Sequence, residues 1–238
     1  MDLDRRTKNA HVVHRTSFAR GIDINFHLGS SNVRRIRAIV FDFGGVLIDW
    51  NPRYLYRKLF PGDEPGMERF LAEIGFAEWN RQQDAGRALA LAVAELGKQF
   101  PAYAHLIRAY HERWEESIAG PLQDTADLLL PLKQAGFELH GLSNWSSETF
   151  AAVRPKYSFF QLFDTILLSG DVRVVKPDPR IFQLLLERIG RSAGECLFID
   201  DLEQNISAAR ALGFETILFE SAERLRKALQ QRGLLPIP

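Results

Sequence analysis

Short apolar runs alternate with amphipathic segments along most of the chain. The run at residues 39–41, Ile-Val-Phe, has the length and composition of a strand buried on both faces. Four later segments predict further strands: residues 137–142, 163–168, 197–199 and 216–219. A segment of helical period precedes each of these four, as at residues 124–135 before the first. The alternation predicts an α/β fold with a Rossmann-like parallel sheet and helices on both faces.

The first two strands are separated by a long stretch of helical character. Its apolar residues recur at helix spacing from residue 54 to about residue 122, and no strand pattern interrupts them. Glycines and prolines divide the stretch into four or so short helices, the first beginning at Pro52 with Asn51 as N-cap. We expect three parts: a flexible N-terminal extension (1–35), a Rossmann-like core (36–50 and 123–238) and an inserted all-helical cap (51–122).

Composition excludes some classes of partner. The 238 residues include 30 Lys and Arg and 30 Asp and Glu, so no global field attracts nucleic acid or an anionic membrane. No apolar run reaches the length of a membrane span. Cys196 is the one cysteine, so no intrachain disulfide forms, which fits a reducing compartment. We expect a cytoplasmic monomer or homodimer that acts on a small molecule.

Polar residues follow four of the predicted strands. They are Asp42, Ser143 with Asn144, Lys176, and Asp200 with Asp201. Because the carboxyl ends of parallel strands meet at one edge of a sheet, where such sheets bind ligands, we expect these side chains to converge. A lone acid after a strand is more often a turn residue, so the interpretation depends on the whole set.

The set suits phosphoryl transfer. A carboxylate such as Asp42 can attack phosphorus and form an aspartyl-phosphate. Together with Asp200 and Asp201 it forms an acidic group suited to Mg²⁺, a hard cation, and the carbonyl of Gly44 could supply another oxygen ligand. These four residues are our predicted metal ligands.

The remaining residues of the set could bind the substrate. Ser143 and the side chain or backbone amide of Asn144 could donate hydrogen bonds to phosphate oxygens. Lys176 could neutralise charge on the nucleophile and on the transferring group. Trp145 directly follows Ser143 and Asn144 and is the aromatic residue best placed to line a pocket.

Four motifs in this order resemble those of the haloacid dehalogenase superfamily. The matching segments are Phe-Asp-Phe-Gly-Gly-Val at 41–46, Leu-Ser-Asn at 142–144, Lys-Pro at 176–177 and Phe-Ile-Asp-Asp at 198–201. The resemblance implies a helical cap of the C1 type between the first two motifs. It also implies that Asp42 is the nucleophile, Ser143 binds phosphate, Lys176 bridges, and Asp200 and Asp201 hold the metal.

One position departs from the phosphatases of that superfamily. They usually carry a general acid and base two residues after the nucleophile, where this chain has Gly44. Dehalogenases of the superfamily also lack that acid, but they have generally lost the paired acids that Asp200 and Asp201 retain here. A sugar-phosphate phosphatase branch, which includes a glucose-1-phosphate phosphatase, resembles the chain in combining Gly with paired acids.

The sequence therefore predicts a Mg²⁺-dependent phosphatase that hydrolyses a small phosphate ester through an aspartyl-phosphate. The alternatives are a 2-haloacid dehalogenase that forms an aspartyl ester, and a catalytically impaired binding protein. A dehalogenase would release halide without a metal, and a binding protein would bind ligand without turnover.

Several further residues have two interpretations. Asp49 either replaces the missing acid or anchors its loop, and Lys156 is a weaker rival of Lys176. Asn205 either bonds a metal ligand or lies on a helix surface. Candidates for substrate contact from the cap, with core packing as the alternative for each tryptophan, are Trp50, Arg53, Trp79, Arg87 and Trp114.

Overall fold

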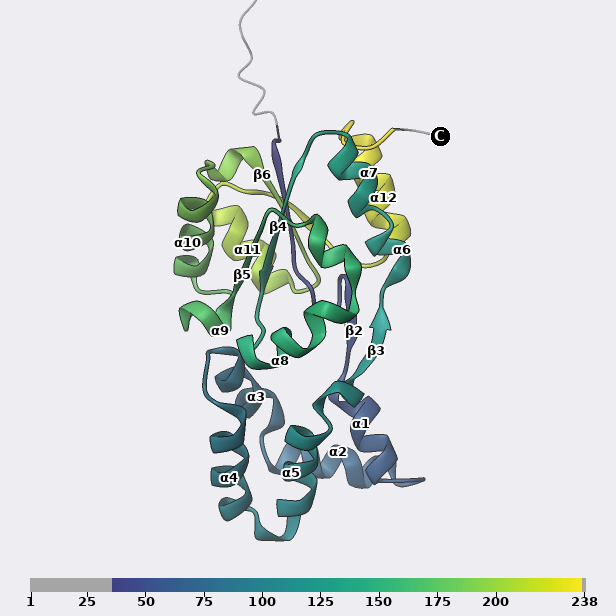
Figure 1. Cartoon of the computed structure of the whole chain (residues 1–238), viewed down its shortest axis with the longest axis vertical. Helices are drawn as coiled ribbons and strands as arrows, with labels where there is room; N and C mark the ends of the chain where they lie inside the picture. Colours follow the sequence, from purple (N-terminus) through teal and green to yellow (C-terminus); the bar gives the residue numbers. More distant parts are fainter. Residues whose placement is uncertain (1–35, 237–238) are drawn as a thin grey trace, which may run out of the picture. The chain divides into compact units, whose positions relative to one another are not determined.

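Five parallel strands form the central sheet of the computed structural model, which describes residues 36–236 (Figure 1). Their order across the sheet is β5 (Thr165–Leu168), β4 (Glu138–Ser143), β1 (Ala38–Phe41), β6 (Cys196–Asp200) and β7 (Glu215–Leu218). Each corresponds to a predicted strand, and the predicted parallel α/β fold is confirmed. The extension predicted at residues 1–35 lies outside the described residues.

Alternate residues of β1 enter two different hydrophobic clusters, as expected for a strand covered on both faces. Ala38 and Val40 pack in one cluster, whereas Ile39 and Phe41 pack in the other. The first cluster includes residues of α10 (Pro179–Ile189) and α11 (Glu203–Ala211). The second includes residues of α6 (Gln123–Ala126), α7 (Leu129–Gln134), α8 (Ser147–Val153) and α12 (Ala222–Gln231).

The single helix predicted at residues 124–135 is instead divided into α6 and α7. Pro131 explains the division, because it has no N–H to donate to the carbonyl of Asp127. In contrast, α10 is continuous from Pro179, and the side chain of Asp178 caps it by accepting from the Arg180 N–H at 2.9 Å.

A two-stranded antiparallel ribbon joins the sheet to the helical stretch, and sequence patterns missed it. It consists of β2 (Ile48–Trp50) and β3 (Ile118–Pro121). The expectation that no strand interrupts residues 54–122 was therefore wrong at β3. Strands of three and four residues, one of them containing Gly and Pro, are too short to show a period.

Five α-helices lie between β2 and β3. They are α1 (Pro52–Leu59), α2 (Glu64–Glu73), α3 (Phe76–Asp84), α4 (Leu89–Gln99) and α5 (Ala104–Glu112). We call this segment, residues 52–112, the helical insert. The predicted start of α1 is confirmed, because Asn51 Oδ1 accepts from the Arg53 N–H at 3.0 Å. Within residues 36–236, none of the helices combines the length and the apolar character needed to cross a membrane.

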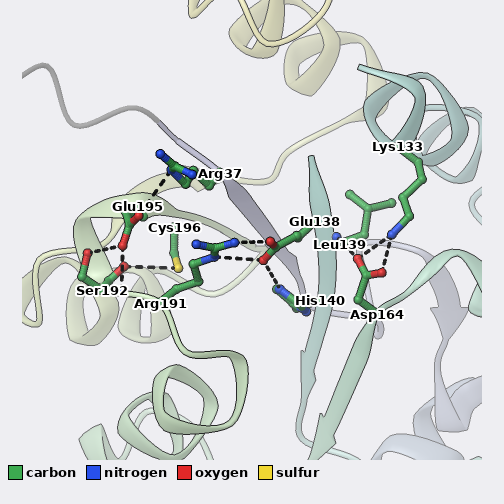
Figure 2. A network of polar contacts seen from close by, with 10 residues as sticks. All are labelled: Arg37, Lys133, Glu138, Leu139, His140, Asp164, Arg191, Ser192, Glu195 and Cys196. Atoms are coloured by element: carbon green, nitrogen blue, oxygen red, sulfur yellow. Dashed lines mark hydrogen bonds and ion pairs between the residues drawn. The ribbon is translucent and has the colours of Figure 1, made fainter. Parts of the chain in front are cut away.

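The amino-terminal edge of the sheet carries a network of paired charges (Figure 2). Arg191 pairs with Glu138 at the start of β4, and Lys133 pairs with Asp164 just before β5. His140 is buried within β4, and its Nε2 lies 3.5 Å from Glu138 Oε2. The opposite, carboxyl edge holds the unbalanced acids described next.

Candidate active site

A tight loop after β1 positions Asp42. The Asp42 N–H donates to the carbonyl of Ile199 at 2.9 Å, so the residue still lies within the sheet. The chain then turns through Gly45, which has φ of 74°. A Cβ at Gly45 would overlap the carboxylate of Asp201, so both the turn and the close approach require glycine here.

Three carboxylates lie together at this edge. One oxygen each of Asp42, Asp200 and Asp201 lies within 4.8 Å of the other two, although Asp200 lies 158 positions after Asp42 in the sequence. Asp42 and Asp200 are buried, whereas Asp201 is exposed. Carboxylate oxygens that converge in this way suit a hard divalent cation such as Mg²⁺.

Lys176 is the positive partner of this cluster. Its Nζ lies 2.6 Å from Asp200 Oδ2 and 3.0 Å from Asp42 Oδ1, and its side chain is 1% exposed. Burial alone would lower the pKa of the ammonium, but the two carboxylates raise it above its usual value. Burial raises the pKa of the Asp42 carboxyl, while Lys176 and the Ser143 hydroxyl act to lower it. One ammonium facing three acids leaves the cluster with an excess of acidic groups.

Asn144 holds the Lys176 loop. Its Nδ2 donates to the Lys176 carbonyl at 3.0 Å, and its Oδ1 accepts from the Lys176 N–H at 2.7 Å. Both ends of the side-chain amide are therefore engaged by the Lys176 backbone. Asn205 supports the site similarly, since its Nδ2 donates to Asp200 Oδ1 at 2.9 Å.

A small cavity of about 60 Å³ opens beside these residues. Its lining comes from the loop after β1, the end of β2, the helical insert with the turn that follows it, and the end of β4 with its loop. The lining residues are Gly44, Trp50, Asn80, Asp84, Tyr110, Trp114, Ser143, Asn144 and Trp145. Ser143, buried at the end of β4, and Trp145 thus border it together. A Cβ at Gly44 would meet no atom within 4 Å, so the missing side chain leaves open space.

The other candidates divide between the cavity and the rest of the molecule. Trp50 and Trp114 line the cavity, whereas Trp79 is buried in the hydrophobic core. Ion pairs engage the two candidate arginines of the insert: Arg53 with Glu68, and Arg87 with Glu95.

The two alternative residues also lie outside the cavity lining. The Tyr54 hydroxyl donates to the carboxylate of Asp49 at 2.9 Å, which fits the anchoring interpretation of Asp49. Lys156 forms an ion pair with Glu115.

Asp84, at the end of α3, borders the cavity and was not predicted. It sits in a polar stretch of the insert with no motif around it. Only the position of Asn80, one helical turn earlier, hints at a bonded pair, and Asn80 Nδ2 does donate to Asp84 Oδ2 at 3.0 Å.

Comparison with known proteins identifies the family. Residues 36–213 match the haloacid dehalogenase-like hydrolases. The chain belongs to this family. Its structure is also similar to that of a HAD family enzyme from Bacteroides thetaiotaomicron, crystallised with magnesium and inorganic phosphate. That comparison has a TM-score of 0.61 and 25% identity, and covers 78% of this chain and 95% of that one.

Curated relatives of this hydrolase include two kinds of chemistry. It is 26% identical to an (S)-2-haloacid dehalogenase of Burkholderia cepacia, over 78% of this chain and 83% of the relative. It is 27% identical to a sesquiterpene phosphatase of Aspergillus oryzae, over 74% of this chain and 86% of the relative. A drimenol cyclase of Aspergillus calidoustus is 27% identical over 82% of this chain, but this chain spans only 36% of that longer protein.

Proposed function

We propose that this hydrolase is a Mg²⁺-dependent phosphatase that cleaves a small phosphate ester, with sugar phosphates as one candidate class. The carboxylate cluster of Asp42, Asp200 and Asp201 beside Lys176 carries the proposal. A halide-releasing site needs no cation, and an acidic cluster without one would repel a carboxylate substrate. A phosphatase makes use of all three acids.

Mg²⁺ would be held by Asp42, Asp200 and Asp201, with the carbonyl of Gly44 as a fourth candidate ligand. The hard-oxygen donor set and its excess of acidic groups fit this ion. When bound, it would supply the positive charge that lets an anionic phosphate approach a carboxylate.

The side chains and backbone of the site each have a separate role in the proposed reaction. Asp42 attacks phosphorus and forms an aspartyl-phosphate, which water hydrolyses. Ser143 and the Asn144 N–H donate hydrogen bonds to phosphate oxygens, and Lys176 balances charge on Asp42 and on the transferring group. Trp145 contacts the organic part of the ester in the cavity. A cavity of about 60 Å³ favours a small organic group.

We also propose that residues 51–122, which contain the helical insert, serve as the cap over a core of residues 36–50 and 123–238. Asp84 and Trp114 of the cap border the same cavity as Trp50 and Ser143 of the core, which supports this division. A cytoplasmic location belongs to the proposal, because the one cysteine, Cys196, is a buried free thiol.

A screen of phosphate monoesters tests the proposal. Wild type and Asp42→Asn are assayed for phosphate release with Mg²⁺ and with EDTA, and in parallel for chloride release from 2-chloropropionate. The proposal expects phosphate release that needs both Mg²⁺ and Asp42. Chloride release that persists in EDTA would contradict it.

Haloacid dehalogenase activity is the second candidate. The haloacid dehalogenase relative favours it, and so does Gly44, since an ester formed from a halide leaving group needs no proton donor. Asp42 would then form an aspartyl ester with carbon. Membership in a hydrolase family favours either reaction over the impaired binding protein.

A further inference from the structure

Cleavage of a phosphate ester needs a proton for the departing oxygen unless that oxygen is a good leaving group. Gly44 has no side chain to supply one, and Lys176 is held by two carboxylates. Among the cavity-lining residues, all within 36–236, two can titrate: Asp84 and Tyr110. Burial raises the pKa of Tyr110 well above its usual value, which makes it a poor proton donor at neutral pH.

A directional chain of hydrogen bonds orients Asp84. The Trp114 indole N–H donates to the Tyr110 oxygen at 3.0 Å, and the Tyr110 hydroxyl donates to Asn80 Oδ1 at 2.8 Å. Because an indole N–H can only donate, the Tyr110 oxygen accepts from Trp114 and its O–H donates to Asn80. The Asn80 side-chain oxygen therefore faces Tyr110, and its amide N–H faces Asp84. The chain fixes which way the carboxyl points.

The core also holds Asp84 from the other side. The Ser146 backbone N–H donates to its carboxyl. The Ser169 hydroxyl donates to its backbone carbonyl and accepts from the Trp145 N–H at 3.0 Å. These bonds tie the end of α3 to the loop that follows Ser143, so the carboxyl borders the space where the phosphate ester is expected.

We propose that Asp84 is the general acid that protonates the leaving-group oxygen, an inference that rests on the proposed phosphatase function. As Asp42 Oδ bonds to phosphorus, the phosphorus–oxygen bond to the leaving group breaks, and the Asp84 proton passes to that oxygen to give an alcohol. When water hydrolyses the aspartyl-phosphate it releases a proton, and Asp84 takes it up.

The state of the carboxyl suits this role. Burial raises the pKa of Asp84 to about 7, the Asp42 charge adds to the increase, and the bonds from Ser146 and Asn80 oppose it. A substantial share of the carboxyls is then protonated near neutral pH. A protonated carboxyl can still accept these bonds with one O–H left to donate.

Leaving-group dependence tests the acid. Asp84→Asn is compared with wild type and with Asp49→Asn, a matched control outside the cavity lining. The measurement is kcat/KM with Mg²⁺ for glycerol 2-phosphate, an alkyl ester, and for p-nitrophenyl phosphate, whose leaving group needs no proton. The inference predicts that Asp84→Asn loses about 10²–10⁴-fold on the alkyl ester, with a much smaller loss on the aryl ester. Asp49→Asn is expected to match wild type on both.

Equal losses on the two esters, or none, would overturn the acid role, as would a loss confined to KM. A wild type that cleaves neither ester would contradict the phosphatase function itself. A wild type that cleaves both, with an unchanged ratio in Asp84→Asn, would overturn the acid role alone.

A rescue variant distinguishes loss of the proton donor from loss of the folded structure. Since a side chain at position 44 meets open space beside the same cavity, Gly44→Asp is added to Asp84→Asn. Partial recovery on the alkyl ester, at an unchanged melting temperature, is the expected result. No recovery in a folded double variant that still cleaves the aryl ester would count against proton donation as the missing function.

Discussion

The side chain of Asn144 forms two hydrogen bonds, of 2.7 and 3.0 Å, with the backbone of Lys176, which lies 32 positions later in the sequence. The loop after β4 thereby fixes the start of the Lys176 side chain, whose ammonium then reaches both Asp42 and Asp200. Asn144 is thus a positioning residue as well as a candidate donor to phosphate.

Asn144→Ala removes both hydrogen bonds to the Lys176 backbone. Two lost hydrogen bonds are expected to lower the free energy of unfolding by about 1–3 kcal/mol. Displacement of Lys176 is expected to lower kcat for p-nitrophenyl phosphate by about 10²-fold. Denaturant unfolding and steady-state kinetics measure the two effects. The matched control is Gln123→Ala, which removes an exposed hydrogen bond to Asp127. An Asn144→Ala variant with wild-type kcat would contradict the positioning role.

Mg²⁺ is expected to stabilise the fold in the absence of any substrate. A ligand that binds only the folded state at about 100 times its dissociation constant adds about 2.7 kcal/mol. Calorimetry should show a higher melting temperature with Mg²⁺ than with EDTA. Asp201→Asn should abolish the increase, because this exposed carboxylate belongs to the cluster, whereas Asp49→Asn should retain it. An identical response of the two variants would argue against the predicted ligands.

The two adjacent glycines should respond differently to alanine. Gly45→Ala forces a Cβ into the left-handed region and against Asp201, so we expect a loss of about 1–3 kcal/mol. Gly44→Ala meets open space and should leave the free energy of unfolding nearly unchanged. Chemical denaturation of both variants checks the difference, and equal losses would be inconsistent with the loop geometry.

His140 should make stability depend on pH. Burial lowers the pKa of its imidazole below 6.5, against the raising effects of Glu138 and Asp164, while Lys133 lowers it further. The unfolded chain therefore binds the proton first as the pH falls through about 6.5, and the free energy of unfolding decreases until the folded-state pKa is reached. The melting temperature of His140→Leu should fall less than that of wild type between about pH 7.5 and 5.5. The exposed His105→Gln is the control, and a slope unchanged in His140→Leu would refute this assignment.

The sequence predicted much of the fold because strands and helix starts depend largely on residues that are neighbours in the chain. Apolar runs located the five strands, and Asn51 indicated the start of a helix that its side chain caps. Strand ends then brought the acids to one edge. Pro131 lies within the segment 124–135, so the reason for the division of this helix is itself local.

Other features depend on tertiary contacts. The ribbon of β2 and β3 forms from segments far apart in the chain, each too short to show a pattern. Asp84 borders the cavity because the end of α3 packs against the loop after β4 and against Ser169, which directly follows β5. The residues around Asp84 in the sequence do not encode this packing. The two hydrogen bonds between Asn144 and Lys176 likewise depend on tertiary contacts.

The central claim is that Asp42 becomes phosphorylated, and peptide mapping tests it most directly. The wild type is quenched in acid during turnover of p-nitrophenyl phosphate with Mg²⁺, digested, and analysed by mass spectrometry. The account predicts a phosphoryl group on Asp42 in the wild type and an unmodified peptide from Asp42→Asn. Phosphate release by the wild type with the phosphoryl group on another residue, or undiminished turnover by Asp42→Asn, would contradict it.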